Sequence, residues 1–552
     1  MSRAGLLTGW FAILQAFTVL PSFAGPNTTI GQNFLGSSFF TNSAALPPDA
    51  NGAIGPQHFV EFINGAFAAY DRNDPGNVLR QSDIDFWFNA GVSVAADQGV
   101  TDPRVVYDPL SQRWFASMIN FDANAADPTL EANDFLLAFS ATSDPTGEWV
   151  GFRFRADTKS NAFADFPTLG VDSNAVYLSG NMFKGGDNNI GPNLVCIPKV
   201  DLLNSNISTR TYFGILNPDV YGWILQPATS SDASTNGSIL SMGDIGSDSE
   251  LHSNIFMFQV LGPGHSGATL STSVQITVNP YVCPFNTDMG FPLFNPTQPD
   301  GTRQLMANDP RFSAKVYSVN GVLYAAHNTE FNNRIAIQWY RVNSTNGALL
   351  EQGMISDSDL DLFFPSIAAN STGAVLIGCN GSSIDTFVSS FAYIGQTVGG
   401  VTAFGSPLLL QSGKVSYHDL NELFLSGDPV PESRWGDYSA SSVDPNDPTH
   451  LWTIQIIPSD QDPDLEYGVW STQITELIVT QAQAPVVLNI APAGTNVLIS
   501  WPLSAATFQL QSNTNLALNS WFNVPATLST NGSIVSTLLP IQSPQHFFRL
   551  KQ

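Results

Sequence analysis

Residues 165–179 read DFPTLGVDSNAVYLS, and residues 364–378 read FPSIAANSTGAVLIG. From their Phe-Pro pairs onward, the two stretches align without a gap. Each gives a turn, a strand of small residues, a tighter turn and a second strand. Looser copies occur at 49–63, 102–116, 316–326 and 435–445. Because one short hairpin cannot bury its apolar face alone, these copies predict a radial or stacked β-architecture.

The spacing of the copies predicts an all-β fold with a β-propeller over residues 47–480. Nothing in that range has the pattern of a long amphipathic helix, and blades of about four strands would accommodate seven copies. Six or eight blades remain alternatives. We expect residues 25–46 to form a lead-in or a closing strand. The seven expected blades start near these residues: Asp49, Asp102, Asp165, Gly222, Arg311, Phe364 and Arg434.

The pattern changes near the C-terminus. Residues 481–485, QAQAP, read as a linker, and five short strands follow within residues 486–552. This density of strands predicts a small antiparallel β-sandwich, in which Trp501 is expected to anchor the core.

Composition excludes several classes of partner. The chain has 552 residues, with 20 Lys and Arg against 46 Asp and Glu, and its formal net charge is −26. This sign repels phosphate backbones and anionic membrane surfaces, so we expect no nucleic-acid partner. A monomer is favoured, although composition leaves the oligomeric state open.

The first 24 residues have the pattern of a secretory signal peptide. Arg3 precedes an apolar stretch, and Ser22-Phe23-Ala24 gives a small-x-small cleavage site. A membrane anchor is the alternative, but the apolar run is short and ends at Pro21. We therefore expect a secreted or cell-surface protein without a transmembrane segment.

Several phrases together resemble secreted bacterial β-propeller proteins of the sialidase-like or BNR type. They lie at 48–56, 102–108, 143–147 and 434–439, and the tail from Val497 to Leu550 resembles fibronectin-III-like or immunoglobulin-like modules. One departure matters. The nearest match to a sialidase Asp-box, at 143–149, lacks its spacing and the Thr before the Trp, so the resemblance implies a fold without carrying over catalytic residues.

Charged residues within the repeated phrase are the candidates for ligand binding. In a propeller, equivalent positions from different blades can surround one mouth of the central channel. The alternative is that each Asp hydrogen-bonds backbone amides within its own turn. The candidates are Asp49, Asp102, Arg104, Asp165, Arg434 and Asp437.

A sialidase-like mechanism would need three converging arginines, a Tyr activated by a Glu, and an acid/base Asp. Arginines beside Trp114 and Trp435 also suit structural cation–π contacts. The catalytic residues stay unassigned, and a non-enzymatic protein is favoured. The candidate arginines are Arg104, Arg113, Arg153, Arg155 and Arg434.

Two acidic clusters offer oxygen ligands at alternate positions, as calcium requires, although neither has an EF-hand pattern. For both clusters, the alternative is a solvated acidic loop. We expect no required cofactor, and calcium is the one metal considered. The clusters are Asp357, Asp359 and Asp361, and Asp460, Asp462 and Asp464.

The leading hypothesis is therefore a secreted propeller that binds an extracellular glycan or protein on one face. A sialidase-like exo-glycoside hydrolase and a purely structural cell-surface protein are the alternatives.

Overall fold

A computed structural model describes the chain in eleven stretches, and two compact units divide it, one comprising residues 25–481 and the other including residues 482–552. The expected signal peptide and the linker at 481–485 lie outside the described residues. The described residues are 26–186, 188–234, 236–245, 251–283, 295–301, 305–419, 433–461, 468–480, 488–515, 521–540 and 546–551.

The all-β expectation is confirmed. Described residues of the first unit form seven sheets of four or five strands, antiparallel except for one short parallel pair. In the first three sheets the strands follow one another in chain order. They are β2 (Asn51–Ile54), β3 (His58–Ile63), β4 (Ala66–Asp71) and β5 (Val78–Gln81); β6 (Gln98–Asp108), β7 (Arg113–Asp122), β8 (Asp134–Ser140) and β9 (Trp149–Arg155); β10 (Phe163–Val171), β11 (Ala175–Phe183), β12 (Asn189–Pro198) and β13 (Thr211–Ile215).

The next three sheets each have a fifth strand. Their members are β14 (Trp223–Pro227), β16 (Asn236–Met242), β17 (His252–Leu261), β18 (Thr269–Leu270) and β19 (Val274–Tyr281); β15 (Thr229–Ser230), β20 (Tyr317–Val319), β21 (Val322–Phe331), β22 (Arg334–Asn343) and β23 (Leu349–Ile355); β24 (Asp361–Ala369), β25 (Ala374–Ser383), β26 (Thr386–Val398), β27 (Val401–Phe404) and β28 (Leu408–Gln411).

The seventh sheet joins the two ends of the unit. It contains β29 (Ala440–Val443), β30 (His450–Gln461) and β31 (Gly468–Thr480), and its outer edge is β1 (Asn27–Ser38). β1 pairs antiparallel with β31, so residues more than 430 positions apart share one ladder.

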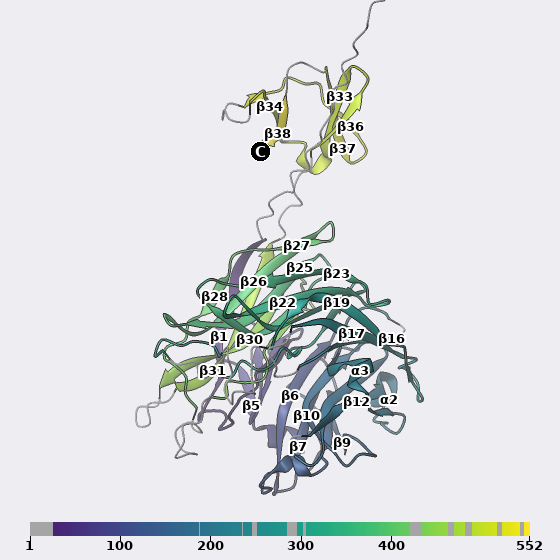
Figure 1. Ribbon diagram of the computed structural model, residues 1–552, viewed down its shortest axis with the longest axis vertical. Coiled ribbons are helices and arrows are strands. Elements are labelled where there is room, and N and C mark those ends of the chain that lie inside the picture. Colours follow the sequence, from purple (N-terminus) through teal and green to yellow (C-terminus); the bar gives the residue numbers. More distant parts are fainter. Residues whose placement is uncertain are drawn as a thin grey trace, which may run out of the picture. The chain divides into compact units, whose positions relative to one another are not determined.

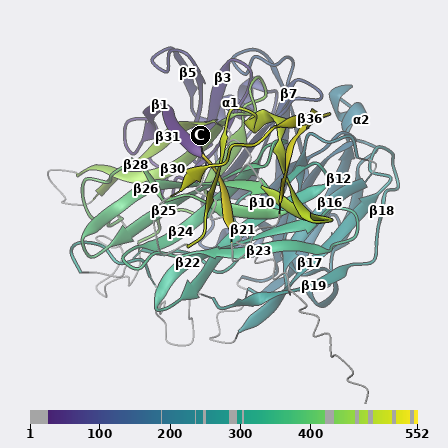
Figure 2. The ribbon, with the colours of Figure 1, turned by 90° about the horizontal axis from the view of Figure 1, so that it is seen from above.

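The first strands of the sheets lie side by side as a ring. β2 contacts β6 and β29, β6 contacts β10, β10 contacts β14 and β15, and β24 contacts β20 and β29. In Figure 2, β10 and β24 lie toward the middle, whereas β5, β18 and β28 lie toward the periphery. This radial arrangement is a β-propeller.

The repeated phrase encodes the entry into three of the innermost strands, β6, β10 and β24. Asp102 in β6, Phe166 in β10 and Phe364 in β24 have positive φ angles of 61°, 51° and 49°. Each sits at a register shift relative to the next strand, and a Pro follows it. The phrase therefore specifies a β-bulge, which turns the chain into the ring.

Small residues in the phrase reflect crowding at the ring. A Cβ added to Gly170 would lie 2.6 Å from the backbone oxygen of Pro227 in the neighbouring sheet. Hydrogen bonds also join neighbours, because Thr168 donates to the Leu225 carbonyl at 2.7 Å and Gln226 donates to the Phe312 carbonyl at 2.6 Å. Side chains of this phrase thus connect adjacent blades.

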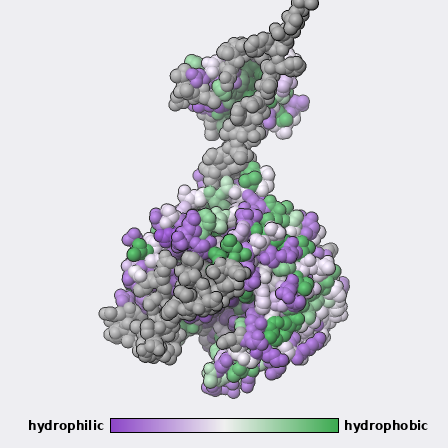
Figure 3. All heavy atoms as spheres, viewed as in Figure 1, coloured by the Kyte–Doolittle hydropathy of each residue, from purple (hydrophilic) through white to green (hydrophobic). Residues whose placement is uncertain are grey.

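Larger apolar side chains fill the space between neighbouring sheets. Phe62, Trp87, Trp114 and Met118, for example, form one buried cluster between the first and second sheets. On the face shown in Figure 3, hydrophobic residues form small, separate groups among hydrophilic ones.

Helices are short and lie in connections (Figure 1). Within the described residues, none is long and apolar enough to cross a membrane. They are α1 (Asp83–Asn89), α2 (Lys199–Leu203), α3 (Pro218–Tyr221) and the 3-10 turns Pro128–Leu130 and Leu503–Ala505.

The described residues of the second unit form two antiparallel sheets and a core of their own. Trp501 is buried there with Ile499, Leu510 and Val535, as expected of a core anchor. Its assignment as a fibronectin-III-like or immunoglobulin-like sandwich stays a prediction. The sheets contain β32 (Asn489–Ala493), β33 (Asn496–Pro502), β37 (Ile534–Pro540) and β36 (Ser529–Asn531), and β35 (Phe522–Asn523), β34 (Gln509–Asn513) and β38 (Phe547–Lys551).

Candidate functional site

Charged side chains gather where the innermost strands begin, and we call this group the entry cluster. All six ligand-binding residues proposed from the repeats belong to it, and Arg311, which leads into β20, joins them. Their charges act on one another's pKa values, which requires them to be close. The entry cluster comprises Asp49, Asp102, Arg104, Asp165, Arg311, Arg434 and Asp437.

Two of the aspartates connect neighbouring blades. The Asp437 N–H donates to Asp49 Oδ1 at 2.8 Å, and the Phe166 N–H donates to Asp102 Oδ2 at 3.1 Å. Asn64 bridges the pair, because its Nδ2 donates to Asp49 Oδ2 at 2.8 Å and its Oδ1 accepts from the Asp102 N–H at 2.9 Å. The carboxylates of Asp49 and Asp102 therefore accept backbone N–H groups of a neighbouring blade. Hydrogen bonds to amides within the same turn, the alternative considered from the sequence, do not account for these contacts.

Arg104 forms the centre of the buried part of the cluster. Its side chain is 4% exposed, and its guanidinium lies 3.5 Å from the centre of the Tyr438 ring. Nε donates to the Pro167 carbonyl at 2.8 Å and Nη1 to the Ser313 carbonyl at 2.9 Å. Nη2 is buried and has no hydrogen-bond partner among the described residues.

The other two arginines pair with carboxylates. Arg434 Nη2 lies 3.1 Å from Asp437 Oδ1, and Arg311 makes a bidentate pair with Asp309 at 2.7 and 2.6 Å. The Arg434 side chain is 42% exposed and that of Asp437 is 17% exposed. Solvent therefore reaches this outer layer, whereas Asp49, Asp102 and Arg104 form a buried floor.

Burial shifts the proton affinity of the floor. Burial, followed by the charges of Asp165 and Asp437, raises the pKa of Asp102 to about 7. Burial and the charges of Asp437 and Asp102 also raise the pKa of Asp49 well above its ordinary value. Near pH 7 the Asp102 carboxyl group thus binds a proton in part of the molecules, whereas the same group in water would be ionised.

Three arginines converge in the entry cluster. Two of them, Arg104 and Arg434, were among the candidates predicted from the sequence, and the third is Arg311. The charge of Asp437 acts on Arg104, Arg311 and Arg434 alike. The remaining candidates lie in other contacts: Arg113 donates to carbonyls of its own turn, and Arg153 and Arg155 pair with Asp134.

Among the described residues, no group of three closely spaced carboxylates includes Asp357, Asp359 or Asp361, and calcium binding at the two acidic stretches stays a prediction. Asp361 is buried and accepts the N–H groups of Thr297 and Ile335 at 3.0 and 3.1 Å, while Asp357 accepts amides of its own turn. Asp460 is exposed, and Asp462 and Asp464 lie outside the described residues. Among described residues, the carboxylate oxygens of Asp49, Asp102 and Asp437 lie within 4.8 Å of one another, a spacing that could hold a cation.

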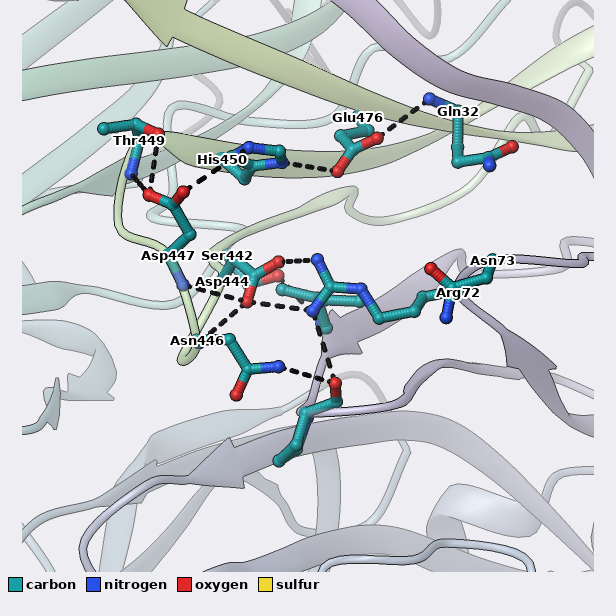
Figure 4. Close-up of polar contacts among 12 residues, drawn as sticks. Gln32, Arg72, Asn73, Ser442, Asp444, Asn446, Asp447, Thr449, His450 and Glu476 are labelled. Atoms are coloured by element: carbon teal, nitrogen blue, oxygen red, sulfur yellow. Dashed lines mark hydrogen bonds and ion pairs between the residues drawn. The ribbon is translucent and has the colours of Figure 1, made fainter.

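A second described group, Asp444, His450 and Glu476, meets the same distance limit, and Figure 4 shows how it is used. Asp444 pairs with Arg72, and His450 Nδ1 lies 2.7 Å from Glu476 Oε1. Glu476 also accepts the Gln32 N–H of β1 at 3.0 Å. The Glu476–Gln32 bond holds the closing strand β1 to the last sheet, and the Arg72–Asp444 pair joins the first sheet to the last.

Sequence reasoning missed Arg311, Asn64 and Tyr438. Arg311 and Asn64 lie outside the aligned phrase, although Arg311 was expected to open a blade. Tyr438 directly follows the predicted residue Asp437, and this position was the one signal that could have identified it.

Comparisons with known proteins give structural similarity without a family. No family model and no curated protein matches the chain. A PL25 ulvan lyase is 10% identical with a TM-score of 0.38, covering 78% of this chain and 92% of its own. A Trypanosoma rangeli sialidase is 9% identical with a TM-score of 0.35, covering 95% and 89%. The α-L-arabinofuranosidase Arb93A from Fusarium graminearum is 9% identical with a TM-score of 0.36, covering 80% and 98%. Similarity at this level assigns no activity or ligand to the chain.

Proposed function

We propose that the chain is an exported β-propeller that binds an extracellular glycan at the entry cluster. The observation that carries the proposal is the convergence of charged positions from separate repeats into one partly exposed group. Its buried floor retains an unpaired donor, Arg104 Nη2.

The chemistry of the outer layer suits hydroxyl-rich ligands. Arg434 and Arg311 present N–H donors beside the carboxylate acceptors Asp437 and Asp165. A sugar hydroxyl donates one hydrogen bond and accepts others, so neighbouring hydroxyls can bind both kinds of group at once. A purely anionic ligand would meet repulsion from the aspartates.

The test is a glycan array probed with the labelled full chain, with and without calcium. We expect the wild-type protein to retain at least one glycan. Arg434→Gln and Asp437→Asn should weaken retention about tenfold or more, which corresponds to a loss of about 1.4 kcal/mol.

Arg113→Gln is the matched control, because the Arg113 guanidinium contacts only carbonyls of its own turn among the described residues. Its retention should equal that of the wild type. Absence of any retained glycan, or equal retention by all variants, would contradict the proposal. Capture of a protein ligand without any glycan would favour the other binding hypothesis.

A glycoside hydrolase is the second candidate, because Asp102 has a raised pKa close to three arginines. A carboxyl group that holds its proton near pH 7 can act as a general acid. However, the Tyr438 hydroxyl donates to the Pro103 carbonyl at 3.0 Å instead of pairing with a Glu. The tyrosine nucleophile of a sialidase-like mechanism thus has no support here.

Fluorogenic aryl glycosides test this candidate. Turnover by the wild type that disappears in Asp102→Asn would favour it. Lack of turnover on all substrates, together with glycan retention, would leave a binding protein.

A further inference from the structure

A cavity lies at the opposite ends of the innermost strands, and we call it the exit cavity. It has a volume of about 220 Å³. Residues from the ends of the innermost strands line it, including Ile54 of β2, Val106 of β6, Val171 of β10 and Val319 of β20. Asp49, Asp102 and Asp165 stand at or near the beginnings of the first three of these strands, so the exit cavity lies farther along the strands than these aspartates.

Both acidic groups that line the exit cavity are neutralised within the fold. Lys199 Nζ lies 2.7 Å from Asp108 Oδ2. Arg72 pairs with Asp444 through two N–H groups, of which Nη1 donates to Oδ1 at 3.1 Å (Figure 4). Neither carboxylate is available to balance another cation.

Lys315 is the unbalanced charge of this cavity. Its side chain is partly buried, and no hydrogen bond or ion pair joins its ammonium to a described residue. Burial, with a smaller effect from Arg104, lowers the pKa of Lys315 to about 8. A desolvated ammonium without a partner is costly, and an anion would offset that cost.

A second polar group lacks a partner in the same cavity. Thr229 Oγ1 is buried and has no hydrogen-bond partner among the described residues. The rest of the lining includes Ile54, Val106, Val171 and Val319. The lining thus combines one unbalanced cation, one unpartnered hydroxyl and apolar residues with other polar residues such as Ser230 and Asn370. A single unbalanced positive charge matches a singly charged organic anion better than a multiply charged phosphate.

We propose that the exit cavity binds a small organic monocarboxylate, whose carboxylate pairs with Lys315 Nζ and accepts a hydrogen bond from Thr229 Oγ1. This site goes beyond the proposed glycan-binding function and does not depend on it.

Calorimetric titration of the full chain at neutral pH tests the proposal. The ligands are acetate, lactate, benzoate, glucuronate and inorganic phosphate. We expect saturable binding of at least one carboxylate. Lys315→Met should weaken carboxylate binding by at least about tenfold, because a charged pair is lost. Thr229→Val should weaken it by a smaller factor, because only a neutral hydrogen bond is lost. Lys414→Met, at an exposed lysine, is the control and should bind as the wild type does.

Folding of Lys315→Met is checked by its thermal unfolding midpoint, which should not fall, because the change removes a partly buried charge that has no partner among the described residues. If that variant does not fold, Thr229→Val provides the comparison. Failure of every carboxylate to bind the wild type would overturn the proposal. The proposal would also be overturned if folded Lys315→Met bound the carboxylate with unchanged affinity. If Lys315→Met does not fold, unchanged affinity of Thr229→Val would overturn it. Tighter binding of phosphate than of any carboxylate would do the same.

Discussion

At the residue scale, the position with positive φ at the bulges of β6, β10 and β24 shows that one backbone conformation can carry side chains of different chemistry. Asp102 and Phe166 occupy it in neighbouring sheets with φ angles of 61° and 51°. Asp102 accepts the Phe166 N–H, while the Phe166 ring packs with Ile224 and Tyr438. The bulge is shared, and the side chain decides whether the position is polar or apolar.

The raised pKa of Asp102 predicts a pH-dependent stability. Its ordinary pKa is 3.8 and its pKa in the folded chain is about 7, so the folded state binds the proton more tightly. The stabilising contribution is therefore complete below about pH 4 and is lost as pH rises through 7. One pKa unit corresponds to about 1.4 kcal/mol, so the total is on the order of a few kcal/mol.

Asp102→Asn removes this titration and keeps an acceptor for the Phe166 N–H. We expect the unfolding midpoint of the wild type to fall more between pH 5 and pH 8 than that of the variant. Circular dichroism melts at several pH values measure the difference. Parallel pH profiles for the two proteins would show that Asp102 does not hold the proton.

At the scale of elements, the closing strand β1 depends on a buried carboxylate. Glu61 of β3 accepts hydrogen bonds from the Ser37 hydroxyl of β1 at 2.7 Å, from the Tyr70 hydroxyl at 2.6 Å and from the Thr472 hydroxyl of β31. Its side chain is fully buried. Glu61 thus connects the first sheet to strands β1 and β31 of the last sheet.

Glu61→Ala should destabilise the propeller by about 3 kcal/mol, because it leaves several buried donors without their acceptor. Denaturant unfolding of the full chain measures the change. The control is Glu131→Ala, which alters an exposed side chain and should have little effect. An equal midpoint for Glu61→Ala and the wild type would mean that the closure does not depend on this network.

At the scale of the whole molecule, the repeated phrase was enough to predict the propeller and to bring six distant residues together. Asp49 and Asp437 are far apart in sequence, but equivalent positions of a radial repeat meet at one mouth of the ring. Asp361 has a different outcome, because it begins β24 and its buried side chain accepts the Ile335 N–H, whereas Asp357 lies before the strand and accepts amides of its own turn.

Other features depend on contacts that no single phrase contains. Arg311 reaches the entry cluster from a segment leading into β20, and the exit cavity arises when the ends of several strands meet. The pairing of Arg72 with Asp444 joins the first and last sheets. These contacts follow from ring closure, so the sequence pattern alone could not predict them.

In the proposed function, the outer layer of the entry cluster binds sugar hydroxyls. The most direct measurement is a calorimetric titration of one array-selected glycan into the full-length wild type, Asp437→Asn and Arg113→Gln. We predict saturable binding to the wild type and to Arg113→Gln, with affinity about tenfold weaker or lost in Asp437→Asn. Equal affinity of all three proteins would contradict the claim and place the ligand elsewhere on the propeller.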